Sequence, residues 1–216
     1  MSSIVIKGDT SGQVTLDVPA IAGTTILNLP ASSGTVVVGS VAASAVGQIP
    51  FSTDGATYTP TAKIVSGTAV ASTSGTSVDF TGIPSWAKRI TVLFNAVSTN
   101  GTSLINVRLG TSGGVVATGY ACIGSGIGSG VGTTDSSTGF IFDNGIAAGS
   151  SISATCIINN LSGNIWLFTA GSRRDGANQG IGNGQVTLSG TLNRIRITTA
   201  GGTDAFDAGS INILYE

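Results

Sequence analysis

The sequence contains no histidine, and its only glutamate is the last residue, Glu216. Charged residues make up 9% of the chain, whereas typical soluble domains have about 25%. The missing histidine removes the side chain that enzymes use most often as a general base. Residues that favour exposed helices are scarce, while valine, isoleucine and threonine, which favour strands, are abundant. The composition therefore predicts an all-β protein.

The low charge also limits the classes of partner. A net charge of −1 gives no basis for binding a phosphate backbone, so no nucleic-acid partner is expected. No apolar run approaches the roughly 18 residues of a membrane span, so no membrane insertion is expected. The N-terminus lacks the charged start and apolar core of a signal peptide. We therefore expect synthesis in a cytoplasm.

Cys122 and Cys156 are the whole thiol content of the chain. Both lie in apolar segments, where they are open to two interpretations. One is a disulfide or a reactive thiol, and the other is a pair of small buried hydrophobic residues. Synthesis in a cytoplasm favours the second interpretation.

Residues 1–40 have the pattern of a short, separate β module. Candidate strands lie at 4–6, 14–18, 24–29 and 36–38, and glycine or proline separates them. Four strands of this length cannot bury a stable core alone. The module is therefore expected to need copies of itself or a larger assembly on which to dock.

The rest of the chain divides into a neck and a main domain. Residues 41–62 are rich in small residues, contain two prolines and have few apolar anchors, so an extended neck is expected there. Residues 63–216 form a stretch of ordinary domain size. Short strand candidates with turn signals between them predict a jelly-roll-like antiparallel β-sandwich. The candidates are 64–70, 78–80, 90–97, 104–109, 115–123, 140–142, 151–159, 165–170, 185–188, 193–198 and 211–215.

The clearest local pattern in the main domain is a β-hairpin formed by 90–97 and 104–109. Asn100-Gly101 between them is a strong signal for a tight turn. In the first strand, Ile90, Val92, Phe94 and Ala96 alternate with Thr91, Leu93, Asn95 and Val97. This alternation predicts one apolar face and one mixed face.

Two stretches without such alternation, 124–138 and 171–184, are expected to be long loops, where recognition residues often lie. The glycines at 124–132 recur every second residue and fit no nucleotide-binding motif, so no cofactor is expected. They indicate a flexible loop or a closely packed strand. The second stretch combines a charge cluster with amides that suit an acidic glycan. Its candidate receptor-contact residues are Arg173, Arg174, Asp175, Asn178, Gln179 and Asn183. The alternative, which the weakness of surface ion pairs favours, is a solvated loop or a salt bridge between subunits.

Paired aspartates are the remaining candidates for chemistry. Asp135 with Asp143, or Asp204 with Asp207, has the composition of a glycosidase acid and base. The competing interpretation places all four in turns: Asp135 and Asp143 on either side of the strand 140–142, and Asp204 and Asp207 before the last strand. Aspartate favours turns because its carboxylate accepts hydrogen bonds from nearby backbone amides. The segment 201–207, which contains Asp204 and Asp207, lacks the alternating aspartate and asparagine ligands of a calcium-binding loop, so no metal site is expected. No catalytic residue is therefore assigned.

Four phrases of the sequence resemble segments of tailed-bacteriophage virion appendage proteins. These are GTTILNLPASSGTVVV, GQIPFSTDGATYTPTAKI, SVDFTGIPSWAKRITVLFNAVSTNGTS and RIRITTAGGTDAFDAGSINILYE. Together these phrases cover most of the chain, and residues 110–190 show the least distinctive resemblance. The resemblance implies a virion protein made in a host bacterium, often trimeric, attached by its N-terminus and exposing a C-terminal tip domain. This chain lacks the long shaft of the larger members.

The resemblance leads to three hypotheses. The first is a small, homotrimeric tail fibre, head fibre or spike that contacts a host-surface glycan with its tip. The second is a capsid-decorating cement protein, and the third is a polysaccharide depolymerase, against which the scarce carboxylates and missing histidine count. In the first two, residues 1–40 bind other virion proteins of the tail or capsid. The candidate attachment residues are Ile4, Ile6, Val14, Leu16, Ile26 and Leu29.

Overall fold

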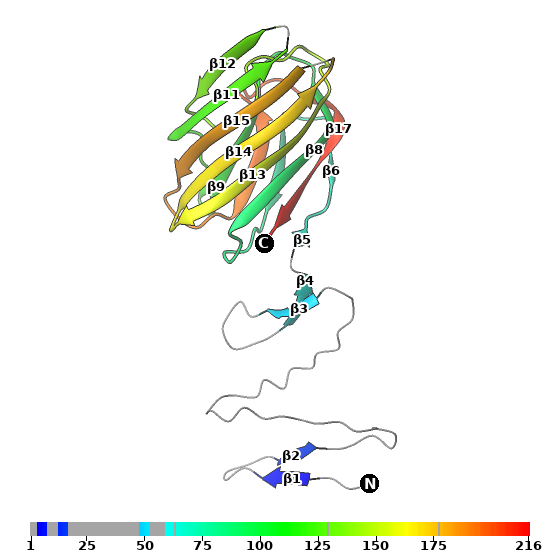
Figure 1. Ribbon diagram of the computed structural model, residues 1–216, viewed down its shortest axis with the longest axis vertical. Helices are drawn as coiled ribbons and strands as arrows, with labels where there is room; N and C mark the ends of the chain where they lie inside the picture. The colour runs from blue at the N-terminus through cyan, green and yellow to red at the C-terminus, as the bar shows by residue number, and fades with distance from the viewer. Residues whose placement is uncertain are drawn as a thin grey trace. The chain divides into compact units, whose positions relative to one another are not determined.

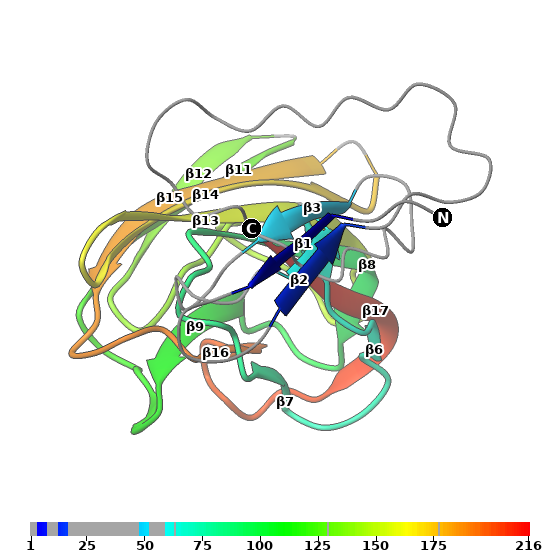
Figure 2. The ribbon, with the colours of Figure 1, turned by 90° about the horizontal axis from the view of Figure 1, so that it is seen from below.

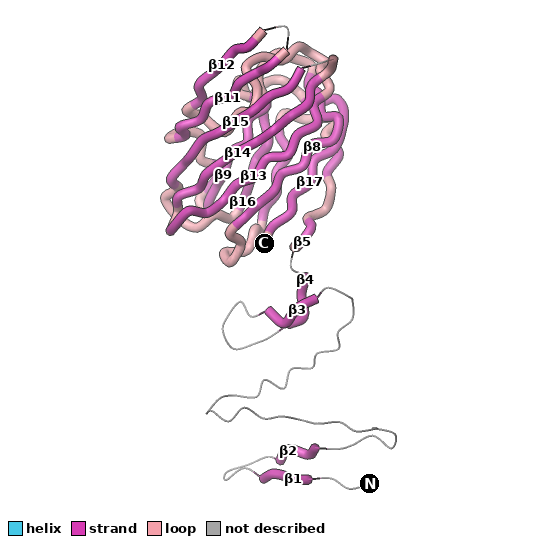
Figure 3. Tube along the Cα trace, in the orientation of Figure 1, coloured by secondary structure: helices cyan, strands magenta, loops and turns pink. Residues whose placement is uncertain are grey.

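The computed structural model describes residues 4–7, 13–16, 48–51, 59–62 and 64–216, except 129 and 177. The chain divides into two compact units, Met1–Ser40 and Val41–Glu216. Every described element is a β-strand (Figure 3), which confirms the all-β prediction. None of the described residues belongs to a helix long and apolar enough to cross a membrane.

Two small antiparallel pairs are described before residue 64. In the first unit, β1 (Ile4–Lys7) pairs with β2 (Gln13–Leu16), so that Ile4 is opposite Leu16 and Ile6 is opposite Val14. The predicted strands 24–29 and 36–38, with Ile26 and Leu29, lie outside the described residues.

The predicted neck also contains a strand pair. There, β3 (Gln48–Phe51) and β4 (Thr59–Ala62) pair with Pro50 opposite Pro60. The prediction of an extended neck did not include this pairing.

The main domain is a sandwich of two antiparallel sheets, which confirms the predicted fold class (Figures 1 and 2). The nine-stranded sheet has the order β12 (Val131–Ser136), β11 (Tyr120–Ile127), β15 (Asn178–Thr187), β14 (Ile165–Arg174), β13 (Ile152–Ser162), β8 (Arg89–Thr99), β17 (Phe206–Tyr215) and β5 (Val65–Ser66), with β6 (Val70–Ala71) also on β17. The four-stranded sheet has the order β10 (Gly114–Val115), β9 (Ile105–Thr111), β16 (Arg194–Thr199) and β7 (Ser77–Thr81).

The hydrophobic core lies between these sheets. Alternate residues of each long strand point inward, as in β14, where Trp166, Phe168 and Ala170 are buried and their neighbours are exposed. The chain passes repeatedly from one sheet to the other, so that β16 lies between β9 and β7 while β17 lies beside β8. This nesting gives the sandwich its jelly-roll-like character.

The predicted hairpin of 90–97 and 104–109 is wrong, because its two strands belong to different sheets. β8 pairs with β13 and β17, whereas β9 pairs with β16 and β10. Asn100 is bonded instead to a distant turn: its N–H donates to the Ala205 carbonyl (2.9 Å) and its side-chain oxygen accepts from the Ala205 N–H (2.9 Å). Asn100-Gly101 therefore makes a corner between sheets.

The predicted alternation in the first of these strands holds only as far as Phe94. Ile90, Val92 and Phe94 are buried, but Ala96 is exposed and Val97 is buried. The register of β8 with both neighbours shifts at this point, and Ala96 has a φ of 50°. A β-bulge thus inserts one residue and reverses the inward and outward faces.

The two long loops predicted at 124–138 and 171–184 are also wrong. Each stretch consists mainly of paired strand residues, since β11 pairs with β12 and β14 pairs with β15. Asp135 accordingly lies in β12 rather than in a turn, and Asp207 lies in β17. Conversely, the predicted strand 140–142 is a single bridge between Phe140 and Val107 inside the connection from β12 to β13.

We call residues 139–145 of that connection the strap, because they cross the interior between the sheets. Phe140 stacks on Phe168 of β14 with centroids 4.5 Å apart, and Phe142 contacts Phe94 of β8 at 5.4 Å. Gly124 and Gly126 of β11, with Gly180 and Gly182 of β15, face the strap. A Cβ on any of these four glycines would lie closer than 3.0 Å to a strap atom. The alternating glycines therefore let the strap lie directly on the sheet.

Candidate functional site

The outer face of the nine-stranded sheet carries two long rows of residues, all but one of them uncharged. Cross-strand register aligns one residue from each of seven strands in each row. The first row is Thr133, Ser125, Ile181, Gly171, Thr155, Leu93 and Asn212, and the second is Asp135, Ile123, Asn183, Thr169, Ile157, Thr91 and Leu214. We call these two rows the neutral face, since Asp135 at the edge strand is its only charged residue.

Large apolar side chains are exposed on and beside the neutral face. Ile123 is 41% exposed and Ile181 is 38% exposed. Leu167 and Ile127 lie in the flanking rows and are exposed to a similar degree. A cluster of exposed apolar residues is a common mark of an interaction surface.

Basic residues lie only at the margins of this surface. Arg89 ends the row that contains Leu167, and it forms an ion pair with Glu216. Arg173 is opposite Gln179 in the row that contains Ile127. An uncharged centre with a polar rim is the composition typical of protein interfaces.

Three of the six predicted receptor-contact residues point outward on this sheet. Arg173 and Gln179 are exposed and opposite one another at the β14–β15 end, where a pocket of about 470 Å³ lies. Asn183 is exposed in the neutral face, between Ile123 and Thr169. The register brings Arg173 and Gln179 together but leaves Asn183 two outward positions farther along β15.

The other three predicted contact residues make internal bonds. Arg174 forms an ion pair with Asp143 of the strap at 3.2 Å, with side-chain exposures of 17% and 4%. The carboxylate of Asp175 accepts a hydrogen bond from the Ser151 N–H (2.6 Å). The Asn178 amide donates to the Asp175 carbonyl (2.8 Å) and thus closes the turn. These three residues hold the turn and the strap in place.

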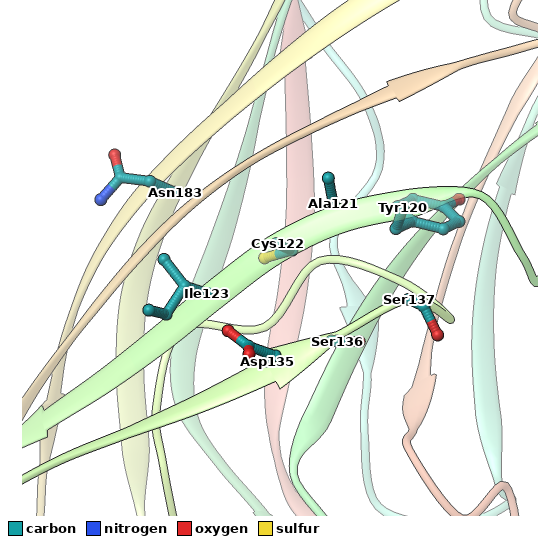
Figure 4. Close-up of a pocket in the computed structure, with 8 residues that line it drawn as sticks. All are labelled: Tyr120, Ala121, Cys122, Ile123, Asp135, Ser136, Ser137 and Asn183. Carbon is teal, nitrogen blue, oxygen red and sulfur yellow. The ribbon is translucent and has the colours of Figure 1, made fainter.

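A second pocket of about 500 Å³ lies at the β11–β12 edge of the neutral face (Figure 4). Ile123, Asp135 and Asn183 line it in one cross-strand row, beside Ser137. The carboxylate, amide and hydroxyl can all bind polar ligand groups, and Ile123 offers an apolar contact. The sequence predicted a turn at Asp135, and this edge was not foreseen, because the segment 131–136 (VGTTDS) has one apolar residue and no alternation that identifies a strand.

The cysteines are buried and form no disulfide, as the second interpretation predicted. Burial raises the pKa of both thiols, most strongly at Cys156. The Cys122 sulfur accepts a hydrogen bond from the Ile141 N–H (3.3 Å), which joins β11 to the strap. Neither thiol is arranged as a reactive nucleophile, because a raised pKa keeps the thiolate scarce.

The paired aspartates have separate bonding partners. Asp143 also accepts from the Asn144 N–H (2.8 Å). Asp204 accepts from the Ser103 N–H (2.8 Å), and Asp207 accepts from the Ser98 hydroxyl. Within the described part of the chain, no group of three or more histidine, cysteine, aspartate or glutamate side chains is placed to hold a metal ion.

Comparisons of the chain with protein-family models, with curated proteins and with solved structures gave no match.

Proposed function

We propose that the protein is a non-enzymatic structural component of a tailed-phage virion, a small homotrimeric fibre or spike whose copies associate through the neutral face. The observation that carries this proposal is the uncharged row across seven strands, with Ile181 in that row and Ile123 in the next. In a cyclic trimer each copy contacts its neighbour through two different parts of its surface, and only residues near the threefold axis meet their own equivalents. The row that contains Ile181 has no charged residue, so neighbouring copies can meet there without like-charge repulsion.

Attachment to the particle is assigned to residues 1–40. The support is the resemblance of GTTILNLPASSGTVVV to a phage structural module and the small size of the β1–β2 pair. Two four-residue strands are not stable alone in water, so docking on another virion protein supplies the missing burial. The resemblance also supports synthesis in the bacterial host and exposure of the main domain to the host surface.

Two features support a role without catalysis. The chain has no histidine, and three of the four candidate aspartates are held in hydrogen bonds or an ion pair. The Asp143 carboxylate is paired with Arg174, and Asp204 is bonded to a backbone amide. A glycosidase needs one carboxyl group held as an acid and a second one near it as a base or nucleophile. Among the four aspartates considered, Asp135 alone is exposed without a described hydrogen bond.

The assembly is tested by measuring the mass of the full-length protein by sedimentation equilibrium. We expect a trimer for the unmodified chain. Ile181→Lys places a charge in the centre of the neutral face and is expected to lower the mass to that of a monomer. Thr81→Lys, at an exposed position on the four-stranded sheet, is the matched control and should remain a trimer. A monomeric unmodified protein would overturn the proposed assembly.

The location is tested with antibodies against the purified protein, applied to particles from cells that encode it and viewed by electron microscopy. Labelling of a fibre or spike supports the proposal. Labelling spread over the capsid surface would replace it with the cement protein, and unlabelled particles would refute a virion role.

A further inference from the structure

Arg108, Arg194 and Arg196 are half-buried and alternate along their strands with buried core residues, so they lie on the outer face of the four-stranded sheet. The two sheets lie on opposite sides of the sandwich (Figure 2). Arg196 of β16 is directly opposite Arg108 of β9, and Arg194 is two residues along β16 from Arg196. They are three of the nine basic residues of the chain. Like charges directly opposite one another in a sheet are destabilising, so the positive charges of these arginines need a negatively charged partner.

A single carboxylate, that of Asp79 on β7, offsets this cluster. Asp79 binds Arg196 through two parallel bonds, Nε to Oδ1 at 2.7 Å and Nη2 to Oδ2 at 2.6 Å. Among the described residues, no carboxylate lies within 4.0 Å of Arg108 or Arg194. Their Nε atoms are buried and have no hydrogen-bond acceptor there. Two guanidinium groups are thus left without a counter-charge.

The stems of these two arginines are held in place by glycines. A Cβ on Gly110 would lie 2.7 Å from Cγ of Arg194, and a Cβ on Gly139 would lie 3.0 Å from Cγ of Arg108. Each stem therefore passes close to a glycine, where a Cβ would crowd it. Side chains that are ordered before binding lose less entropy when a ligand binds.

A pocket of about 430 Å³ ends at Asn193, the residue before Arg194 in the chain. Asn193 lines the pocket, and its side-chain oxygen accepts a hydrogen bond from Nη2 of Arg194 (3.5 Å). Much of the remaining lining consists of hydroxyl groups, from Ser85, Thr111, Ser112, Ser189 and Thr191. Hydroxyl and amide groups can donate and accept hydrogen bonds, as the hydroxyls of a sugar require.

We propose that this pocket and the two unpaired arginines form a binding site for an acidic saccharide. The hydroxyl-lined pocket takes a sugar ring, and Arg194 with Arg108 binds the carboxylate of that sugar or of its neighbour. The planar guanidinium fork matches a carboxylate with two hydrogen bonds, which a lysine cannot reproduce. The site is separate from the neutral face, so it does not depend on the proposed assembly.

The test is calorimetric titration of the full-length protein with tetragalacturonate at low and physiological salt. Tetragalactose, which lacks the carboxylates, and inorganic phosphate are titrated in parallel. The variants are Arg194→Gln and Arg108→Gln, and Arg89→Gln on the other sheet is the matched control. Near-ultraviolet circular dichroism checks the fold of each variant. Hydrogen exchange of the unmodified protein, with and without tetragalacturonate, locates the site without any substitution.

We expect saturable binding of tetragalacturonate, at least tenfold weaker binding of tetragalactose, and weaker binding at the higher salt concentration. Each of the two site variants should weaken tetragalacturonate binding at least tenfold, and Arg89→Gln should change it less than twofold. Protection should appear at 107–112 and 189–196. Absent binding, binding unchanged by both site variants, or protection elsewhere would overturn the site. Equal affinity for inorganic phosphate would overturn its assignment to a saccharide. The mass measurement proposed above does not depend on any of these results.

Discussion

The guanidinium of Arg174 lies 3.2 Å from the buried carboxylate of Asp143, and this pair ties the end of β14 to the strap. Because Asp143 is 4% exposed, a substitution that removes its partner leaves a buried, uncompensated charge. We expect Arg174→Met to lower the free energy of unfolding by about 3 kcal/mol. Urea unfolding followed by tryptophan fluorescence measures this change.

The double variant Arg174→Met/Asp143→Asn provides the control for that prediction. Removing both charges should recover part of the loss, since no isolated charge then remains in the interior. A double variant whose stability equals the sum of the two single losses would show that the ion pair itself contributes little.

The alternating glycines of β15 are predicted to be required for packing of the strap. Gly182→Ala places a Cβ closer than 3.0 Å to the Ile141 carbonyl and to Phe142. We expect a loss of about 2–3 kcal/mol, as for other overpacked interiors. Gly171→Ala in neighbouring β14 is the matched control, because no atom lies within 4 Å of its added Cβ. Its stability should stay within about 0.5 kcal/mol of the unmodified protein, and equal urea midpoints for the two variants would contradict the packing role.

Tyr120 gives the sandwich a defined sensitivity to alkali. Its hydroxyl accepts a hydrogen bond from the Leu109 N–H (2.7 Å) and donates to the Val116 carbonyl (3.1 Å). Burial raises the pKa of Tyr120 to about 12. The unfolded chain loses this proton near pH 10, so the folded state holds more protons between about pH 10 and 12. The contribution of Tyr120 to the free energy of unfolding is therefore complete below about pH 10 and falls as the pH rises toward 12.

Urea unfolding at a series of pH values from 9 to 12 tests this prediction. Ionisation of Tyr120 should lower the free energy of unfolding of the unmodified protein by up to about 2.7 kcal/mol over that range, since each pKa unit corresponds to about 1.36 kcal/mol. Tyr120→Phe lowers the starting stability, since it leaves the Leu109 N–H unpaired, but it should flatten the decline. An equally steep decline in the Phe variant would assign the alkaline loss to other groups.

The β-bulge at Ala96 restricts which residues β8 accepts there. A β-branched residue is strained at the φ of 50° that Ala96 adopts. Because Ala96 is exposed, Ala96→Val changes backbone strain rather than core packing. We expect a loss of about 1–3 kcal/mol, measured as a lower midpoint in urea. Ala121→Val, at an exposed position of β11, should be nearly neutral, and a neutral Ala96→Val would argue against the bulge.

Local composition was sufficient to predict the class of the main domain and the inward faces of several strands. Trp166, Phe168 and Cys156 lie inside, as their apolar contexts indicate, because strand geometry alternates faces with a period of two. The same rule failed at Ala96, since one inserted residue reverses every later face. Nothing in the residues near Ala96 distinguishes the bulge from regular strand.

Pairing between strands and the identity of the surface sites depended on the tertiary structure. The sequence from Ile90 to Leu109 has the local signals of a hairpin, but its two halves lie in different sheets, and Asn100 between them bonds to Ala205, more than a hundred residues away. Gly124, Gly126, Gly180 and Gly182 have no side chain to reveal their faces, and only the strap that lies on them shows why they alternate. Arg108 and Arg194 are scattered in the sequence and meet because β9 and β16 pair. Long-range pairing is set by burial of the whole core, and a local window of sequence does not contain that information.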